Sequence, residues 1–436
     1  MSKYVKEEDK GFIDKTADEV RELAKGDAFC ILPWIHMHPW PQGKVFPCCL
    51  SNTTVDDVVG DLNVQTIEEV YNGHQLKRMR RDFLANKKHH SCTKCYDQEA
   101  LGRIDSLRMK SNEEFVLQPD NWHKFENKID LVKSTQKTGR VDEVNMAYLD
   151  IRFSNICNMR CRMCGPDLSS LWYHDAVDSI YNVTPKQAIY QIAKGSKDFL
   201  SQFDQYLHTV EKIYWAGGEP LIQPQHYDAL RKLLPYAKNI TLEYNSNLNS
   251  VAQGDNKIVD LWKHFKRINC RVSIDGDIDI HSYLRTGSDI NKIENNIKFL
   301  KQSLPDNLFI TATCTTSLFN ITRFDRIIKY YNKLNLPMHC SLVQYPEAIN
   351  IKYLPNELKA KVTKDVRNTV IELRDINKNR HNKVVKWSNY VLQYMNNSGV
   401  NVDSLTNDTT EYVKVMDKLN ETDFLSVYPE FKEYWQ

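Results

Sequence analysis

Three cysteines in one short loop constrain this chain more than any other feature. Cys157, Cys161 and Cys164 are separated by three and then two residues, and they follow an apolar run over 148–153 that predicts a strand. Cysteine thiolates are the usual ligands of iron-sulfur clusters, and such close spacing lets one loop hold a single cluster. Three ligands on a four-iron cluster leave one iron open, as catalytic zinc sites keep an open position. The loop therefore predicts a cluster with a chemical role.

Composition favours an intracellular protein that keeps its thiols reduced. The chain has 436 residues, an odd number of cysteines (eleven) and a charged N-terminus without an apolar leader, which argues against a secreted disulfide scaffold. No apolar run approaches the roughly 18 residues of a membrane span. Lys and Arg number 58 against 56 Asp and Glu, and this balance disfavours a nucleic-acid or membrane partner. We expect a soluble, cytoplasmic protein.

A regular alternation of strands and helices is predicted from residue 148 onward. Helical patterns at 224–236, 289–303 and 322–334 separate strand-like runs. Such alternation indicates βαβ units on a parallel sheet. Six units suit an open, partial barrel, so the expected fold class is α/β with a partial (β/α)6 barrel. The six strands are expected at 148–153, 210–215, 240–244, 270–274, 309–314 and 339–343.

Polar and glycine-rich motifs follow these strands, at the edge where ligands bind in parallel sheets. Paired glycines after the second strand allow a ligand to approach the backbone closely, and the acid beside them offers a charged acceptor. Asparagines at the end of the third strand suit ribose hydroxyls, and an arginine after the fourth suits a carboxylate. The candidate residues are Gly217, Gly218, Glu219, Pro220, Asn245, Asn247, Ser273, Asp275 and Arg285.

A second group of cysteines precedes the barrel. Gln42-Gly43 lies between apolar runs and predicts a hairpin turn that brings Cys30 near Cys48. Cys92 and Cys95 are spaced like a pair of metal ligands, and four such cysteines suit zinc or an iron-sulfur cluster. Cys49 is an alternative to Cys48, and four histidines are alternative ligands: His36, His38, His89 and His90.

The cysteine loop, Gly217–Pro220 and the run Ser273–Gly276, in this order, resemble the radical S-adenosylmethionine (SAM) superfamily. The resemblance implies that SAM chelates the open iron of a 4Fe-4S cluster held by Cys157, Cys161 and Cys164. It also implies that the glycine motif receives the SAM amino group. Met163 stands where family members often carry an aromatic residue against adenine, and its thioether can still contact the ring.

The earlier cysteines resemble the auxiliary-cluster module called SPASM or, in its shorter form, twitch. Gly43 and Gly60-Asp61-Leu62 accompany the cysteines in the family's order. The resemblance implies one auxiliary 4Fe-4S cluster, ligated by Cys30, Cys48, Cys92 and Cys95. The module usually follows the barrel, whereas here it precedes it.

These features divide the chain into five expected parts. The mixed charges of residues 97–144, among them Arg108 and Lys128, predict a solvated face, with the lining of a substrate channel as the alternative. The aromatic residues near the C-terminus predict that the tail packs on the barrel. The parts are an N-terminal helix (1–26), a twitch-like iron-sulfur domain (27–110), a connector (111–144), the partial barrel (145–345) and a helical C-terminal extension (346–436).

The expected function follows from the resemblance. A radical SAM enzyme cleaves SAM reductively to a 5′-deoxyadenosyl radical, which abstracts hydrogen from a substrate C–H bond, and the reductant is a protein such as flavodoxin or ferredoxin. Members with this module commonly modify peptides or proteins, which is the substrate class we expect. The alternatives are a nucleotide, sugar or other small-molecule substrate and, from another class, a non-enzymatic structural metal-binding or electron-transfer protein.

Overall fold

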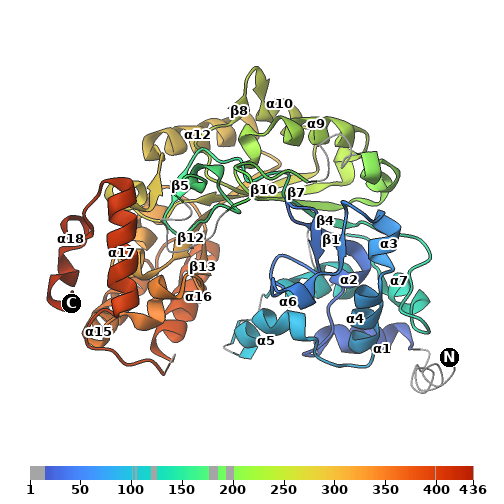
Figure 1. The fold of residues 1–436 in the computed structure, drawn as a ribbon, viewed down its shortest axis with the longest axis horizontal. Helices are drawn as coiled ribbons and strands as arrows, with labels where there is room; N and C mark the ends of the chain where they lie inside the picture. Colours follow the sequence, from blue (N-terminus) through green and yellow to red (C-terminus); the bar gives the residue numbers. More distant parts are fainter. Residues whose placement is uncertain are drawn as a thin grey trace. The chain divides into compact units, whose positions relative to one another are not determined.

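A computed structural model describes residues 15–100, 102–103, 106–118, 125–175, 185–192, 201–397 and 399–435 (Figure 1). Contacts within the chain separate it into two compact units. The N-terminal unit contains Met1–Phe153, Gln191–Tyr214 and Pro235–Thr241, and the C-terminal unit contains Ser154–Tyr190, Trp215–Leu234 and Leu242–Gln436. The division into five parts remains a prediction.

The strands of the N-terminal unit combine parallel and antiparallel pairing. Strand β1 is parallel to β4, with His36 opposite Tyr148, and antiparallel to β2. The predicted hairpin turn joins β1 to β2, and Gly43 adopts φ +87° there, where an added Cβ would meet the Asn63 side chain. In order, the strands are β6 (Lys212–Trp215), β4 (Tyr148–Ile151), β1 (His36–Pro39), β2 (Lys44–Phe46) and β3 (Gly60–Asp61).

Short helices complete this unit. The first begins with a capping box in which Thr16 and Glu19 satisfy each other's backbone N–H groups, and it ends at Gly26 as predicted. Of the helix expected at 1–26, residues 1–14 lie outside the described residues, and Lys15 and Thr16 precede the first helical residue. The helices are α1 (Ala17–Lys25), α2 (Leu32–Ile35), α3 (Ile67–Tyr71), α4 (His74–Leu84), α5 (Thr93–Ala100), α6 (Leu107–Asn112) and α7 (Ile129–Ser134).

The prediction of a solvated face over the connector is wrong for its central charges. Glu114 and Lys128 are each 3% exposed, and Arg108 is 4% exposed. Lys212 lies 2.8 Å from a Glu114 oxygen, and Lys128 lies 2.6 Å from a Glu211 oxygen. Because buried charges are stable only when paired, these partners explain how a charged segment enters the core.

The C-terminal unit contains the predicted alternation of parallel strands and helices. Strand β12 lies between β10 and β13 and is parallel to both. The strand order is β13-β12-β10-β7, so β13 is an edge strand among the described residues and the predicted open α/β sheet is confirmed. The strands are β7 (Thr241–Ser246), β10 (Arg267–Ser273), β12 (Leu308–Thr316) and β13 (Met338–Leu342), with short pairs β8 (Ala252–Gln253) with β9 (Asn256–Lys257) and β5 (Arg160–Cys161) with β11 (Arg285–Thr286).

Helices connect these strands and form the C-terminal extension. Helix α16 packs against both β13 and α15 (Figure 1), and the aromatic side chains Phe424, Tyr428 and Phe431 are buried as predicted. The helices are α9 (Pro224–Leu233), α10 (Ile258–Trp262), α11 (Ile278–Leu284), α12 (Ile290–Ser303), α13 (Leu318–Ile321), α14 (Phe324–Lys333), α15 (Asn356–Glu372), α16 (Lys378–Asn396), α17 (Asn407–Asn420) and α18 (Phe424–Val427).

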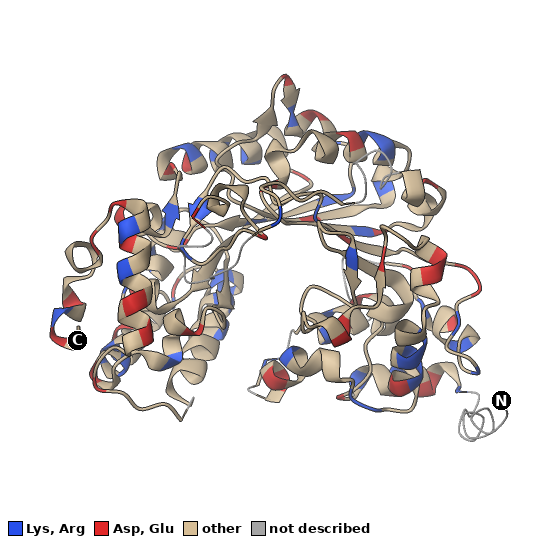
Figure 2. Cartoon of the chain, in the orientation of Figure 1, with Lys and Arg blue, Asp and Glu red and all other residues tan. Residues whose placement is uncertain are grey.

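Acidic and basic residues both occur along the longer helices of the chain. Figure 2 shows the two kinds of residue interspersed over the ribbon, in keeping with the net charge of +2. Among the residues that the structure describes, no helix is both long and apolar enough to cross a membrane.

Candidate metal-cluster sites

A short two-stranded ribbon holds the Cys157–Cys164 loop. Strand β5 within the loop pairs antiparallel with β11, which places Arg285 directly opposite Cys161. One residue further, Arg162 N–H donates to the Leu284 carbonyl at 2.9 Å. Cys164 N–H donates to the Cys161 carbonyl at 3.0 Å, which folds the end of the loop back on the ribbon. The backbone thus brings the later cysteines of the loop together.

The three thiols of this loop influence one another electrostatically. A hydrogen bond from the Cys164 thiol, helped by the nearby Arg285, lowers the pKa of Cys161 to about 7. Burial, followed by the proximity of Cys161, raises the pKa of Cys157 to about 12. Within the described ranges, no three His, Cys, Asp or Glu side chains converge tightly enough for a single metal ion.

Arg285 links this thiol group to the sheet. Its Nη1 donates to Cys161 Sγ at 3.5 Å, and its Nε donates to Asp275 Oδ2 at 2.7 Å. The second Asp275 oxygen accepts from the Thr315 N–H at 2.7 Å. Asp275 is completely buried and Arg285 is 8% exposed. The predicted contacts of Arg285 and Asp275 with SAM remain predictions, but the structure shows both side chains already bonded to the protein.

The glycine motif after β6 packs against the cysteine loop. Gly217 and Gly218 have φ of +77° and +54°, a region that glycine adopts without strain. A Cβ on Gly218 would lie 2.1 Å from the Ile156 carbonyl oxygen, and the Glu219 N–H donates to the same oxygen at 2.8 Å. This close approach explains why the position requires glycine.

The Glu219 carboxylate joins the loops that follow β6 and β7. It accepts from the Asn247 N–H at 2.7 Å, from the Ser246 hydroxyl at 2.8 Å and from the Leu221 N–H at 3.1 Å. Glu219 is 1% exposed, and burial raises its pKa to about 7 despite these bonds. The Glu219 side chain therefore holds these two loops together. Its contact with SAM remains a prediction.

The remaining predicted residues lie at the ends of strands β7 and β10 or in the loops beside them. The side chain of Asn247 donates to Asn158 Oδ1 in the cysteine loop at 2.8 Å. Asn245 Oδ1 is buried with no hydrogen-bond partner among the described residues, and Ser273 is the last residue of β10. Pro220 begins a short 3-10 turn, and Met163 is half-buried beside the last cysteine.

Sequence reasoning missed Arg162, which is fully buried between two of the cysteines. The guanidinium carbon lies 3.7 Å from the centre of the Tyr283 ring, and Nη2 lies 3.2 Å from Asp417 Oδ1. Its local sequence carries no signal of burial, because these partners come from distant parts of the chain.

The auxiliary cysteines gather in the N-terminal unit. Burial, followed by the neighbouring Cys92 and Cys95, raises the pKa of Cys30. Burial also raises the pKa of Cys48, and the further increase comes from its cysteine neighbours Cys49, Cys95, Cys92 and Cys30. For Cys49, burial and then Asp150 raise the pKa. Cys48 therefore interacts with Cys49 and with the other three candidate ligands, whereas Cys49 interacts chiefly with the Asp150 carboxylate and less with Cys95.

Hydrogen bonds to the protein engage three of the four alternative histidines. His36 Nδ1 lies 3.0 Å from the Tyr148 carbonyl oxygen, and His38 Nε2 accepts from Trp40 Nε1 at 3.0 Å. His89 Nδ1 accepts from the Ser91 N–H at 3.3 Å. These bonds favour structural roles for the three rings.

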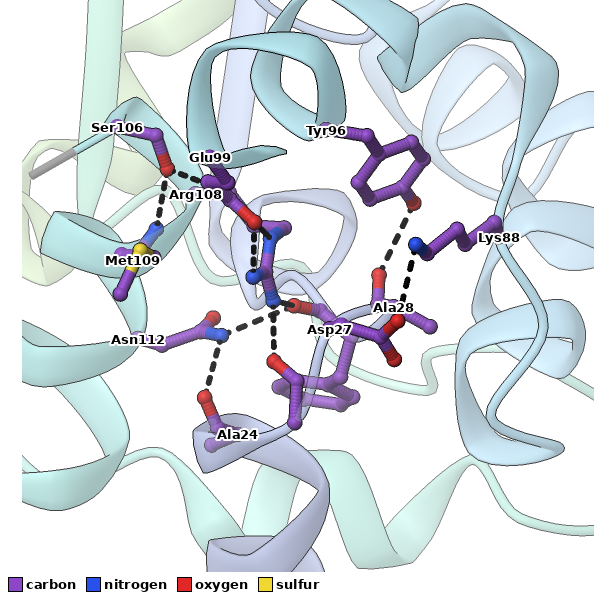
Figure 3. Close-up of polar contacts among 12 residues, drawn as sticks. Ala24, Asp27, Ala28, Lys88, Tyr96, Glu99, Ser106, Arg108, Met109 and Asn112 are labelled. Atoms are coloured by element: carbon purple, nitrogen blue, oxygen red, sulfur yellow. Dashed lines mark hydrogen bonds and ion pairs between the residues drawn. The ribbon is translucent and has the colours of Figure 1, made fainter. Parts of the chain in front are cut away.

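A buried arginine connects the chain before Cys30 with the helix that carries Cys95 (Figure 3). Arg108 binds both oxygens of Glu99, which lies on α5 one turn beyond Cys95. Its Nη1 donates to the carbonyls of Gly26 at 2.8 Å and Phe29 at 2.9 Å. The ion pair therefore fixes two of the cysteine-bearing segments relative to each other.

Comparisons with known proteins match both regions. Residues 151–329 match the profile described as the radical SAM superfamily, and residues 30–96 match SPASM, described as an iron-sulfur cluster-binding domain. No curated protein is significantly similar to the chain.

Several solved structures are similar at low identity. One is native anSMEcpe with bound AdoMet and Cp18Cys peptide, with 16% identity, a TM-score of 0.36, and coverage of 52% of this chain and 60% of that one. Streptococcus suis SuiB bound to S-adenosylmethionine has 13% identity and a TM-score of 0.38, with coverage of 66% and 62%. SuiB bound to precursor peptide SuiA has 13% identity and a TM-score of 0.35, with coverage of 80% and 70%. The chain thus spans less than two thirds of the first two proteins.

Proposed function

We propose that this chain is a radical SAM enzyme with an iron-sulfur domain of the SPASM type and that it modifies a peptide or protein. The observation that carries the proposal is the packing of the glycine motif on the cysteine loop, with the Glu219 N–H 2.8 Å from the Ile156 carbonyl oxygen. This packing supports the proposal, because the motif predicted to contact SAM lies against the loop predicted to hold the cluster.

Each part of the site has a defined task in this proposal. Cys157, Cys161 and Cys164 would hold the SAM-binding 4Fe-4S cluster. A cluster held there, once reduced by an external electron donor such as flavodoxin or ferredoxin, would supply the chemistry that cleaves SAM to methionine and a 5′-deoxyadenosyl radical for hydrogen abstraction from a substrate C–H bond. Gly217 adopts a positive φ that glycine tolerates without strain, and the buried Asp275 keeps Arg285 directed at Cys161.

The auxiliary site has a different task. Cys30, Cys48, Cys92 and Cys95 would supply four thiolates to a second 4Fe-4S cluster, which leaves no iron open for substrate. A closed cluster suits electron transfer better than substrate binding. The peptide or protein substrate is proposed because members with a SPASM module commonly act on such substrates. The small-molecule substrates remain the alternative.

An anaerobic count of iron and acid-labile sulfide tests the cluster assignment. Two 4Fe-4S clusters predict about eight iron and eight sulfide per chain. The variant Cys157→Ala/Cys161→Ala/Cys164→Ala should lose about half of each and retain the auxiliary cluster. Stoichiometric zinc without sulfide, or unchanged iron in the triple variant, would contradict the assignment.

The substrate class needs a separate experiment. Holoenzyme is incubated with SAM, dithionite and a peptide encoded beside its gene, with nucleosides and sugars as parallel candidates. Mass spectrometry should show a modified peptide that depends on SAM. A modified small molecule together with an unchanged peptide would replace the peptide assignment.

A further inference from the structure

The C-terminal end of helix α17 is bonded to both strands of the ribbon that carries Cys161. We propose that residues 417–422, here called the latch, position the cysteine loop for SAM binding, with Asp417 and Asn420 as positioning residues. The latch lies outside residues 151–329 that match the superfamily. This inference rests on the proposed function of the loop, because the latch acts on the SAM site through it.

One half of the latch holds Arg162. Asp417 Oδ1 lies 3.2 Å from Arg162 Nη2 and accepts from the Thr422 hydroxyl at 2.7 Å. The Thr422 hydroxyl also accepts a hydrogen bond from Arg162 Nη2. The Arg162 side chain is 0% exposed and that of Asp417 is 15% exposed, so a displaced guanidinium would be buried without its compensating charge.

Two tyrosines also contact Arg162, one at its side chain and one at its backbone carbonyl. Its Nε donates to the Tyr283 carbonyl at 2.7 Å, and the Tyr283 hydroxyl donates to Asp417 Oδ1 at 2.9 Å. The Tyr412 hydroxyl, earlier on α17, donates to the Arg162 carbonyl. Arg162, Tyr283 and Asp417 thus form a closed triangle of contacts.

The other half of the latch holds the start of the ribbon. Asn420 Oδ1 accepts from the Thr286 hydroxyl at 3.0 Å and from Arg160 Nη2 at 3.2 Å. Thr286 and Arg160 are paired opposite each other in the ribbon. One side-chain oxygen therefore clamps both strands at the same register position.

This arrangement controls where Cys161 lies. Each ribbon strand has only two residues, Arg160–Cys161 and Arg285–Thr286, and so short a pair has little stability of its own. Arg160 and Arg162 flank Cys161, and both are bonded to the latch. A slip of one ribbon strand against the other would separate Cys161 Sγ from Arg285 Nη1, which lies 3.5 Å away in the observed register.

Four single variants of the full chain, each reconstituted anaerobically, test the latch. Asp417→Asn removes the charge, Asn420→Ala removes the clamping oxygen, and Asn420→Asp restores an oxygen at that position. Glu411→Gln is the matched control, because it removes an exposed carboxylate from the same helix. The measurements are the dissociation constant for SAM, the electron paramagnetic resonance (EPR) spectrum of the reduced cluster with and without SAM, and the thermal unfolding midpoint.

We expect Asp417→Asn and Asn420→Ala to weaken SAM binding about tenfold or more and to alter the SAM-induced change in the EPR spectrum. Asn420→Asp should recover both properties, and Glu411→Gln should match wild type. A lower unfolding midpoint with wild-type SAM affinity and EPR spectra would overturn the latch, because its role would then be stability alone. If Asp417→Asn does not fold, the SAM affinity and EPR spectra of Asn420→Ala and Asn420→Asp test the latch by the same criteria.

The same experiment separates this inference from the proposed function. A wild-type cluster whose spectrum responds to SAM, with unchanged values in all latch variants, would overturn the latch alone. A loaded wild-type cluster that does not respond to SAM would overturn the proposed function and the latch with it.

Discussion

Arg285 Nη1 lies 3.5 Å from Cys161 Sγ, and the two residues face each other across a ribbon of two short strands. The guanidinium is oriented by Asp275, whose Oδ2 accepts from Nε at 2.7 Å. A cation held beside a ligand sulfur stabilises the additional negative charge of a reduced cluster. The contact therefore links backbone register directly to the redox properties of the proposed site.

Replacing this arginine should lower the reduction potential of the SAM-binding cluster. In Arg285→Gln the sulfur loses its cationic donor, and we expect a fall of about 60 mV, equivalent to a tenfold change in a one-electron equilibrium. An EPR-monitored redox titration without SAM measures this effect separately from any contact with SAM. Arg231→Gln on α9, a surface arginine paired with Asp228, serves as the control, and equal potentials in both variants would refute the link.

The two adjacent cysteines of the N-terminal unit should behave differently. Cys48 interacts with all three of the other candidate ligands, whereas Cys49 interacts most strongly with Asp150 and with only one of those three, Cys95. Cys48→Ala should therefore lose about four iron per chain, and Cys49→Ala should retain them. Iron analysis after anaerobic reconstitution distinguishes the two variants. The reverse result would assign Cys49 as the ligand.

The buried Arg108–Glu99 pair should be far more important than a surface pair in the same region (Figure 3). Arg108→Met leaves Glu99 and two backbone carbonyls without their guanidinium partner, which should lower the free energy of unfolding by about 3–5 kcal/mol. Lys88→Met breaks a 2.9 Å pair whose side chains are 53% and 73% exposed, which should cost at most about 1 kcal/mol. Urea denaturation of both variants measures the difference, and similar losses would count against a structural role for Arg108.

His226 should make the protein less stable in mild acid. Burial lowers the pKa of His226 from 6.5 to about 3 in the folded chain, and its Nε2 lies 2.8 Å from the Tyr244 hydroxyl. Because the unfolded chain binds the proton more tightly, this contribution is complete above pH 6.5 and is lost progressively as the pH falls toward 3. Between pH 7.5 and pH 5 the loss is about 2 kcal/mol.

A non-titrating replacement isolates that contribution. His226→Gln should show a smaller loss of unfolding free energy than wild type between the two pH values, by about 2 kcal/mol. Urea denaturation at each pH gives both numbers. Equal pH dependence in the two proteins would mean that His226 does not titrate as proposed.

Local sequence patterns predict the strands and the cysteine loop well because their signals lie within a few residues. The strand predicted at 309–314 is β12 (Leu308–Thr316), and the hairpin turn lies at Gly43 as expected. Pairs between distant residues leave no such signal. The contact of Arg162 with Tyr412 joins residues 250 positions apart, and Arg108 is surrounded by charges that resemble a solvated face. Burial of these arginines follows only from the fold.

The formation of 5′-deoxyadenosine by the reconstituted protein with SAM and dithionite tests the proposed radical chemistry most directly. We expect wild type to produce this nucleoside and Cys161→Ala, with its auxiliary cluster intact, to produce none. A wild-type protein that holds both clusters and yet forms no 5′-deoxyadenosine, or a Cys161→Ala variant that forms it at the wild-type rate, would refute radical SAM chemistry at this loop.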